Sequence, residues 1–241
     1  MNPVKLSVAL AVALAAVPFA SFAREVALEE ESESPFSWSV AATSDYVFRG
    51  VSQTDEGPAL QADFIWTAPG GFYAGAWASN VDFGSGGPDV ELDTFIGYST
   101  DVGGDDFVNV DILLNRYNYL GGDGSDLAYN ELLGTVTFAG AVSLTAGYTN
   151  DVYASGEDGW YVGVAGSLPL GNDYTLDASV GHSLFGDGGV ARDYIDYSLG
   201  VGKSWGSFSA SLAYVATNRD GTANFGPLAD DRAVLTVTYS P

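Results

Sequence analysis

The sequence contains no cysteine, one histidine and one methionine among its 241 residues. Without cysteine the chain forms no disulfide, no zinc–thiolate site, no iron–sulfur cluster and no thiol nucleophile. Basic residues are also scarce, since eight Lys and Arg stand against 31 Asp and Glu, which gives a formal net charge of −23 at pH 7. Nucleic-acid binders follow phosphates with clustered Lys and Arg. We therefore expect no nucleic-acid partner.

The composition is nevertheless that of a folded chain. Hydrophobic residues make up 46% of it, aromatic residues 13% and charged residues only 16%. Disordered chains of high net charge lack this apolar content. The 31 glycines and 14 tyrosines favour strands and turns over helices.

The N-terminus has the three parts of a secretory signal peptide. A short basic start that includes Lys5 precedes an apolar run over residues 6–20, and small residues follow up to Ala23. The run is shorter than the roughly 20 residues of a spanning helix. The predicted organisation is a cleaved signal peptide over residues 1–23, an acidic periplasmic leader over residues 24–35 and a folded domain over residues 36–241.

Apolar and polar side chains alternate in twelve segments of the folded domain. A period of two is typical of a β-strand with one apolar and one polar face. The expected strands span residues 37–48, 59–68, 72–81, 89–100, 107–119, 128–138, 141–150, 159–170, 174–185, 193–203, 207–217 and 232–240. Most carry their apolar set on even numbers. Residues 72–81 leave their register open, because Tyr73 and Trp77 lie on one face of the strand and Phe72 lies on the other.

The connections between these segments alternate in length. Short ones, such as residues 69–71 and 139–140, take turns with longer polar ones, such as residues 49–58 and 218–231. Strands of about ten residues joined in this way are typical of outer-membrane barrels. The sequence thus predicts an all-β fold, a transmembrane antiparallel up-and-down β-barrel of about 12 strands with short periplasmic turns and longer extracellular loops.

A soluble exported sandwich or a lipocalin-like barrel also alternates. We favour the membrane barrel because the polar face is small, acidic and poor in Lys and Arg, which suits a lumen. Aromatic residues also fall near the segment ends, where interfacial girdles lie. The expected location is the bacterial outer membrane, and the expected partners are its lipid, lipopolysaccharide and the barrel-assembly machinery.

Several ordered motifs resemble one family. They are Thr43-Ser44-Asp45-Tyr46-Val47-Phe48-Arg49-Gly50, Pro58-Ala59-Leu60-Gln61, residues 71–81, Glu91-Leu92-Asp93, Gly97-Tyr98, Tyr117-Asn118-Tyr119 and Tyr129-Asn130-Glu131. The set is similar to the TorF-type porin family of uncharacterised exported proteobacterial proteins. It covers the first half of the chain closely and the second half by general pattern. The resemblance implies an outer-membrane barrel and a pore but no particular solute.

Catalytic motifs are incomplete. The only histidine, His182, would need a serine on its own face of the strand, but the next residue on that face is Leu184 and Ser183 points the other way. A nucleophile elbow would need glycine at Phe185. We therefore expect no catalytic residue.

Cofactor and metal motifs are incomplete as well. Residues 202–204 mimic the end of a phosphate-binding loop without its first glycine, which would stand at Tyr197. Residues 123–126 and 218–221 resemble calcium loops but lack the glutamate at the twelfth loop position. We therefore expect no cofactor and no metal site. Loose binding of a divalent cation by the acidic loops stays open, although solvated loop carboxylates are the favoured interpretation.

Carboxylates line the lumen if the even apolar set faces lipid. The predicted lumen and ion-pathway residues are Asp45, Arg49, Asp63, Glu91, Asp93, Asp111, Glu131 and Asp177, of which Arg49 is the one clear inward base. Rings of carboxylates favour cations. Four inward aromatic residues would constrict the bore or stack against a solute: Phe95, Tyr117, Tyr119 and Tyr161.

Three functions follow from this pattern, in decreasing order of preference. A porin or channel for small solutes and cations predicts conductance. A non-conducting structural or surface-interaction barrel predicts a sealed lumen and a role for loop residues such as Asp220, Asp230 and Asp231. A barrel lipase or protease predicts turnover that is lost in His182→Ala.

Overall fold

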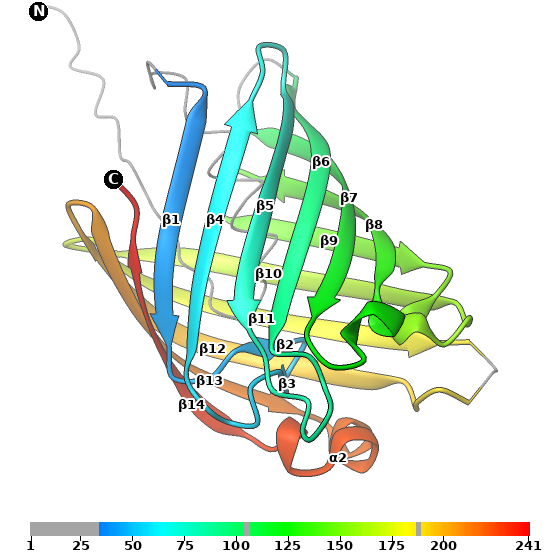
Figure 1. The fold of residues 1–241 in the computed structure, drawn as a ribbon. Coiled ribbons are helices and arrows are strands. Elements are labelled where there is room, and N and C mark those ends of the chain that lie inside the picture. Colours follow the sequence, from blue (N-terminus) through cyan, green and yellow to red (C-terminus); the bar gives the residue numbers. More distant parts are fainter. Residues whose placement is uncertain (1–33, 104–106, 187–188) are drawn as a thin grey trace, which may run out of the picture.

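The computed structural model describes residues 34–103, 107–186 and 189–241 (Figure 1). The predicted signal peptide and residues 24–33 of the predicted leader lie outside the described residues. Twelve antiparallel strands form one closed barrel, in which β1 pairs with both β4 and β14. The predicted fold class is confirmed.

Each barrel strand pairs with its neighbour along the chain. The strands are β1 (Phe36–Thr43), β4 (Ala59–Thr67), β5 (Phe72–Asn80), β6 (Val90–Val102), β7 (Val108–Leu120), β8 (Tyr129–Phe138), β9 (Val142–Thr149), β10 (Gly159–Gly171), β11 (Tyr174–Phe185), β12 (Tyr194–Trp205), β13 (Phe208–Thr217) and β14 (Arg232–Tyr239). Eleven of these pairings join consecutive barrel strands, and the twelfth closes β14 onto β1.

The remaining elements lie at the end of the barrel that carries the long connections. They are the short hairpin β2 (Val47–Phe48) and β3 (Val51–Ser52), the helix α2 (Arg219–Phe225), and the 3-10 turns η1 (Gly124–Leu127), η2 (Val152–Ala154) and η3 (Gly226–Ala229). None of the helices in the described part of the chain is long and apolar enough to cross a membrane.

The two ends of the barrel differ, as Figure 1 shows. The β4–β5 turn stands at the upper end, where β1 begins, whereas β2, β3 and α2 lie at the lower end. The tight turn between β8 and β9 uses Ala139 and Gly140 at φ values of 49° and 59°. Two consecutive positive φ values match a type I′ turn, whose twist fits an antiparallel pair. We call the two ends the short-turn end and the loop end.

The alternation in the sequence divides the wall into an outer apolar face and an inner face. Leu60 and Phe64 on the outside are 63% and 50% exposed, whereas Ile65 on the inside is fully buried. The open register of residues 72–81 is also resolved, because Tyr73 and Trp77 point inward and Phe72 outward. The ring of Tyr73 lies over Gly97 of β6, where a Cβ atom would stand 2.2 Å from the ring.

The first strand is shorter than predicted. The sequence predicted a strand over residues 37–48, but β1 ends at Thr43 and the chain then turns into the barrel. The hydroxyl of Thr43 donates to the carbonyl of Asp45 at 2.9 Å, and the carboxylate of Asp45 accepts from Ser52 at 2.7 Å. These bonds fold residues 44–58 back on themselves. We call residues 44–58 the inserted segment.

Candidate functional site

The inner wall has a bulky side and a small side. From β5 to β8 the inward positions hold large side chains that form one buried cluster, including Tyr73, Trp77, Phe95, Leu113, Tyr117, Tyr129 and Leu133. From β9 to β13 the inward positions in the middle and toward the short turns hold small ones, including Ser143, Thr145, Ser167, Thr175, Ser179, Gly200, Gly202 and Ser211. Toward the long connections the same strands carry large inward side chains, such as Tyr161 and Tyr194.

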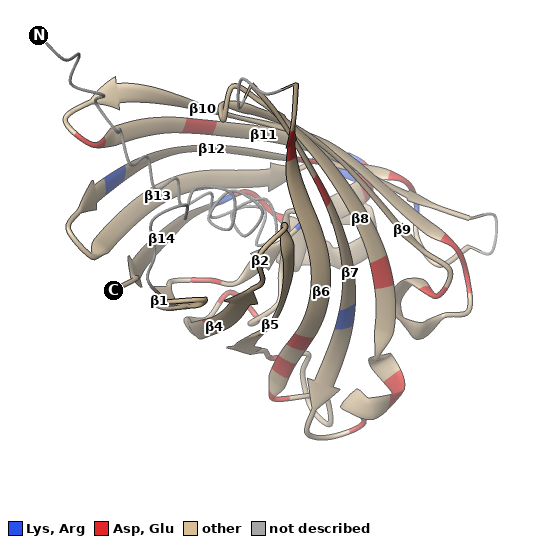
Figure 2. Cartoon of the chain, turned by 90° about the horizontal axis from the view of Figure 1, so that it is seen from above, with Lys and Arg blue, Asp and Glu red and all other residues tan. Residues whose placement is uncertain are grey.

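The inserted segment crosses the lumen at the loop end and contacts both sides of the wall. Figure 2 looks into the barrel from above and shows β2 inside the ring of strands. On the bulky side, the Tyr46 hydroxyl donates to Glu91 Oε1 at 3.3 Å and its ring packs against Trp77. On the other side, Val47 packs into a cluster with Val215 and Val234. These contacts lie on strands to either side of β1. The segment reaches the opposite wall through Arg49, which contacts Glu131 of β8 and Tyr161 of β10.

Arg49 occupies the middle of this crossing. Its Nη2 atom lies 2.7 Å from Glu131 Oε1 of β8, and its guanidinium lies over the ring of Tyr161 at 4.1 Å. The hydroxyl of Tyr194 donates to its backbone carbonyl at 3.1 Å. Burial alone would lower the pKa of this guanidinium, but Glu131 raises it, and the resulting pKa lies well above its ordinary value. Arg49 is thus a permanently charged side chain fixed from three strands.

The backbone at Arg49 and Gly50 depends on glycine. Both residues have positive φ, 48° and 78°. A Cβ atom at Gly50 would stand 2.5 Å from a Thr217 side-chain carbon, so the hairpin touches the wall there without space for a side chain. The left-handed pair turns the chain between β2 and β3, and this turn directs Arg49 toward Glu131.

A second buried ion pair anchors the start of the inserted segment. Arg232 Nη1 of β14 lies 2.8 Å from Asp45 Oδ2, and the two side chains are 13% and 5% exposed. Arg49 was expected to be the one clear inward base, and this was wrong, because Arg232 is a second one. The apolar set of the last strand lies on odd numbers, so its even position 232 points inward. The signal was therefore present in the sequence.

The structure brings the other predicted lumen acids to the inner wall, each with a polar contact. Asp63 accepts from the Ser39 hydroxyl, Asp111 from the Tyr73 hydroxyl at 2.8 Å and Asp177 from the Thr175 hydroxyl at 2.8 Å. Asp93 accepts from the Asn115 amide at 3.1 Å. The second oxygen of Glu131 accepts from the Tyr117 hydroxyl at 2.8 Å.

One inward acid escaped the sequence analysis. Asp196 of β12 is 3% exposed, and its Oδ2 atom has no hydrogen-bond partner among residues 34–103, 107–186 and 189–241. Its strand carries the apolar set on odd numbers, as β14 does, so the switch in parity along the chain hid both Asp196 and Arg232.

The four predicted constriction residues pack mainly against the wall and the inserted segment. Tyr117 stacks on Tyr129 with 4.5 Å between ring centroids, and Phe95 meets the edge of Tyr73 at 6.3 Å. Tyr161 supports Arg49, and Tyr119 is partly buried beside the bulky cluster. These rings and the inserted segment thus lie together inside the barrel.

The passage beside Arg49 is narrow. A cavity of about 10 Å³, enough for about one water molecule, is lined by Arg49, Glu131, Tyr153 of η2, Ser183 and Phe185. Burial, the largest cause, raises the pKa of the Tyr153 hydroxyl. This hydroxyl stays neutral at physiological pH, so the one fixed charge pair at the cavity is Arg49–Glu131.

His182 and Ser183 stand on opposite faces of β11, as predicted. His182 is partly exposed on the outer face and Ser183 is buried on the inner face. Within the described residues no group of three or more His, Asp or Glu side chains is placed so that it could hold a metal ion. His182 and Ser183 therefore do not lie together as a catalytic pair.

The solved structures to which the chain is similar include two porins. The first is the KdgM porin in complex with disordered oligogalacturonate, at 10% identity and a TM-score of 0.54, covering 86% of this chain and 99% of that chain. The second is the NanC porin, at 9% identity and a TM-score of 0.57, covering 84% and 98%. At this identity the likeness shows the fold, a 12-stranded barrel of the porin kind.

Matches to sequence families and to curated proteins give different results. No curated protein matches the chain. The model of one family, described as bacterial protein of unknown function (Gcw_chp), matches residues 27–240, nearly the whole chain. The protein therefore belongs to the Gcw_chp family of bacterial proteins of unknown function.

Proposed function

We propose that the protein is an outer-membrane channel for small solutes, with a preference for cations, and that the inserted segment narrows its lumen. The observation that carries this proposal is a closed barrel that is apolar outside and lined with carboxylates inside. The porin fold of KdgM and NanC and the resemblance to the TorF-type family support it. Export through the signal peptide over residues 1–23, with residues 24–35 left as a periplasmic leader, and insertion by the barrel-assembly machinery are parts of the same proposal.

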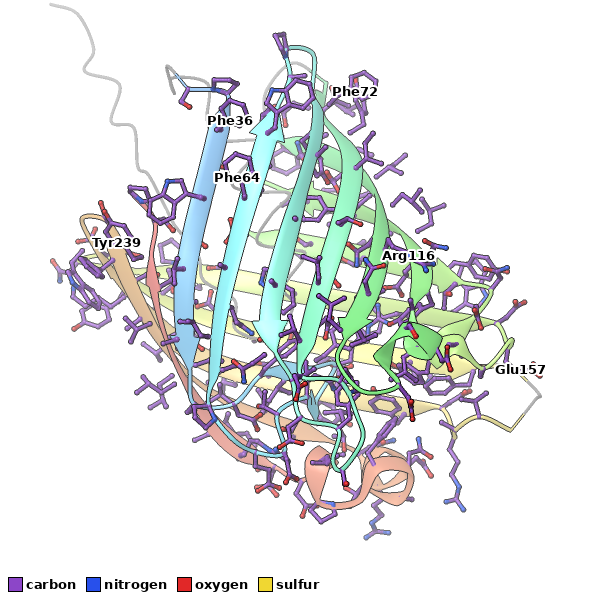
Figure 3. All side chains as sticks on the ribbon, in the orientation of Figure 1. Phe36, Phe64, Phe72, Arg116, Glu157 and Tyr239 are labelled. Atoms are coloured by element: carbon purple, nitrogen blue, oxygen red, sulfur yellow. The ribbon has the colours of Figure 1, made fainter. Side chains whose placement is uncertain are left out.

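The outer surface supports a place in a bilayer. Figure 3 labels Phe36, Phe64, Phe72 and Tyr239, which lie on the outside toward the short-turn end. Their rings form pairs, such as Phe36 with Phe64 at 5.4 Å. At the loop end Tyr148 and Trp160 form a similar outward pair at 4.7 Å. Two aromatic zones around an apolar belt are what a membrane barrel needs at its two interfaces.

The inward charges support a preference for cations. The inward acids outnumber the inward bases Arg49 and Arg232, and both bases are already paired with acids. Oligogalacturonate, the ligand in the KdgM structure, is a polyanion. We therefore do not transfer that ligand to this chain, because an acidic lumen repels anions.

Refolded protein in a planar bilayer under a KCl gradient should give a reversal potential of cation-selective sign. The double variant Asp63→Asn/Asp177→Asn should shift this potential toward zero, because both acids face the lumen near the short-turn end. The matched control is Asp123→Asn/Asp126→Asn, which removes two exposed loop acids beside η1. An anion-selective sign, or an equal shift in the control, would contradict the cation preference.

A non-conducting barrel is the second candidate function. The buried cluster that fills the bulky side of the lumen, together with the inserted segment, favours it. Under this alternative the loops would carry the function, and neither the natural protein nor a variant without the inserted segment would conduct. An enzymatic role has less support, because His182 and Ser183 do not share a face.

An outward polar patch supports lipopolysaccharide as a partner. Arg116 of β7 is paired with Thr94 on β6 and with Asn130 on β8. It is the next outward residue after the apolar Leu114 in the direction of the loop end. Figure 3 shows its side chain outside the barrel wall. Its Nε atom donates to Asn118, and among the described residues it forms no ion pair. A base at this height faces the outer-leaflet headgroups, whose phosphates would pair with it.

Arg116→Ala should reduce the lipopolysaccharide that co-purifies with the barrel several-fold, as measured by native mass spectrometry. Lys203→Ala is the matched control, because Lys203 is the outward base at the opposite, short-turn end, where it contacts the Tyr174 ring and the Asn172 carbonyl. Equal retention in all three proteins would argue against this partner site.

A further inference from the structure

Three neighbouring polar side chains on the bulky side of the lumen are almost completely buried. Glu91 and Asp93 occupy alternate inward positions of β6, and Asn115 lies on β7. Their exposed fractions are 2%, 1% and 0%. The carboxyl groups of Glu91 and Asp93 are within hydrogen-bonding reach of each other, and the Asn115 amide donates to Asp93 Oδ2 at 3.1 Å. The three side chains therefore form one contiguous cluster.

No base of the described chain neutralises this cluster. The two inward arginines are paired elsewhere, Arg49 with Glu131 and Arg232 with Asp45. Neither Glu91 nor Asp93 forms an ion pair among the described residues. Two carboxylates in contact and shielded from water repel each other strongly unless a positive charge stands between them.

Three oxygen atoms of the cluster accept no hydrogen bond from a donor in the described part of the chain. They are Oε2 of Glu91, Oδ1 of Asp93 and Oδ1 of Asn115. Buried polar atoms are normally satisfied, and leaving one unsatisfied costs about 1–3 kcal/mol. A proton shared by the two carboxyl groups would leave the amide oxygen of Asn115 unsatisfied. A divalent cation would neutralise both carboxylates, and the Asn115 amide oxygen is a third oxygen donor in the same cluster.

We propose that Glu91, Asp93 and Asn115 bind a calcium ion in the lumen wall. The donors are hard oxygens with a summed charge of −2, which a divalent cation neutralises. Nitrogen and sulfur donors, which transition metals favour, do not contribute. Mg²⁺ demands an octahedral shell and keeps several waters, whereas Ca²⁺ accepts irregular sets of carboxylate and amide oxygens. The site depends on the barrel fold and not on whether the lumen conducts.

Terbium luminescence of the refolded full chain tests this site, because Tb³⁺ replaces Ca²⁺ and emits when a nearby aromatic ring is excited. Tyr46 donates to Glu91 at 3.3 Å and packs on Trp77, so sensitisers stand beside the site. Chelator-treated protein should bind one Tb³⁺ per chain with sensitised emission, and excess Ca²⁺ should displace it. Asp93→Asn and Glu91→Gln should each weaken binding at least tenfold.

Two further variants make the result specific. Asn115→Ala removes only the amide oxygen, keeps both carboxylates and should weaken binding several-fold. The control Asp123→Asn/Asp126→Asn removes acids from the loop that loosely resembles a calcium site and should bind as the natural protein does. Heat-modifiable migration on gels reports folding of each variant.

Three results would overturn the calcium site. They are the absence of sensitised emission from the folded protein, emission that is unchanged in both folded Asp93→Asn and folded Asn115→Ala, and emission that is lost in the loop control. Conductance is recorded on the same preparations. A protein that conducts without binding Tb³⁺ would refute the calcium site and leave the proposed channel intact. A protein that binds Tb³⁺ without conducting would refute the channel and leave the calcium site intact.

Discussion

Replacing residues 45–57 with a two-residue turn is expected to raise the single-channel conductance several-fold. The inserted segment crosses the lumen, and the cavity beside Arg49 holds about one water molecule. Its removal leaves the lumen at the loop end without the chain that now crosses it. The change is compatible with the barrel, because Thr43 and Ala59 already face each other as paired residues of β1 and β4. A tight hairpin can therefore join the two strands without a shift in register.

Recordings in planar bilayers give the conductance of the natural and shortened proteins. A matched control removes residues 84–86, the exposed tip of the connection between β5 and β6, and should leave the conductance unchanged. If the shortened protein folds, as heat-modifiable migration shows, and still conducts as the natural protein does, the inserted segment is not the constriction. If neither protein conducts, the non-conducting barrel becomes the better description.

Glu131→Gln is expected to lower the free energy of unfolding by about 3 kcal/mol. The substitution leaves Arg49 charged in a site where its side chain is only 12% exposed, without the carboxylate 2.7 Å away. A buried charge that loses its partner keeps its desolvation cost and loses its compensation. The double variant Glu131→Gln/Arg49→Met should recover most of the loss, because it removes the buried charge as well.

Reversible unfolding of the barrel in lipid vesicles, followed by tryptophan fluorescence, measures these differences. The exposed pair Arg192–Asp220 is the control, since its side chains are 71% and 46% exposed and lie 3.5 Å apart. Asp220→Asn should change the free energy of unfolding by less than about 1 kcal/mol. Equal effects of Glu131→Gln and Asp220→Asn would show that the lumen pair is solvated.

The local pattern of the sequence was enough to predict the barrel. Alternation places Leu60 and Phe64 outside and Asp63 inside, because side chains in a strand change faces at every residue. This placement is local and does not depend on contacts with distant parts of the chain. The strand count and the alternation of short and long connections follow from the same periodicity. The register of residues 72–81 needed the structure, which places Tyr73 over Gly97 of the next strand.

The inserted segment could not be predicted from local pattern. Residues 44–48 continue the alternation of β1, so they were expected to prolong that strand. Their true position depends on partners far away in sequence, Glu131 for Arg49 and Arg232 for Asp45. Such contacts depend on which side chains the closed barrel brings together. The acids of the lumen were found because they stand in strands, whereas their pairing and the role of Arg49 as a bridge needed the fold.

The bonds at the start of the inserted segment bear on the order in which the barrel is made. The first and last strands, β1 and β14, share four paired positions, against eight for β1 and β4. Ser44 exchanges two hydrogen bonds with Leu235, at 2.9 and 3.0 Å, and Asp45 holds Arg232. These contacts exist only after the last strand to be synthesised has met the first. A half-assembled barrel therefore lacks the bonds that hold the start of the inserted segment, and these bonds form in the same step that closes the barrel.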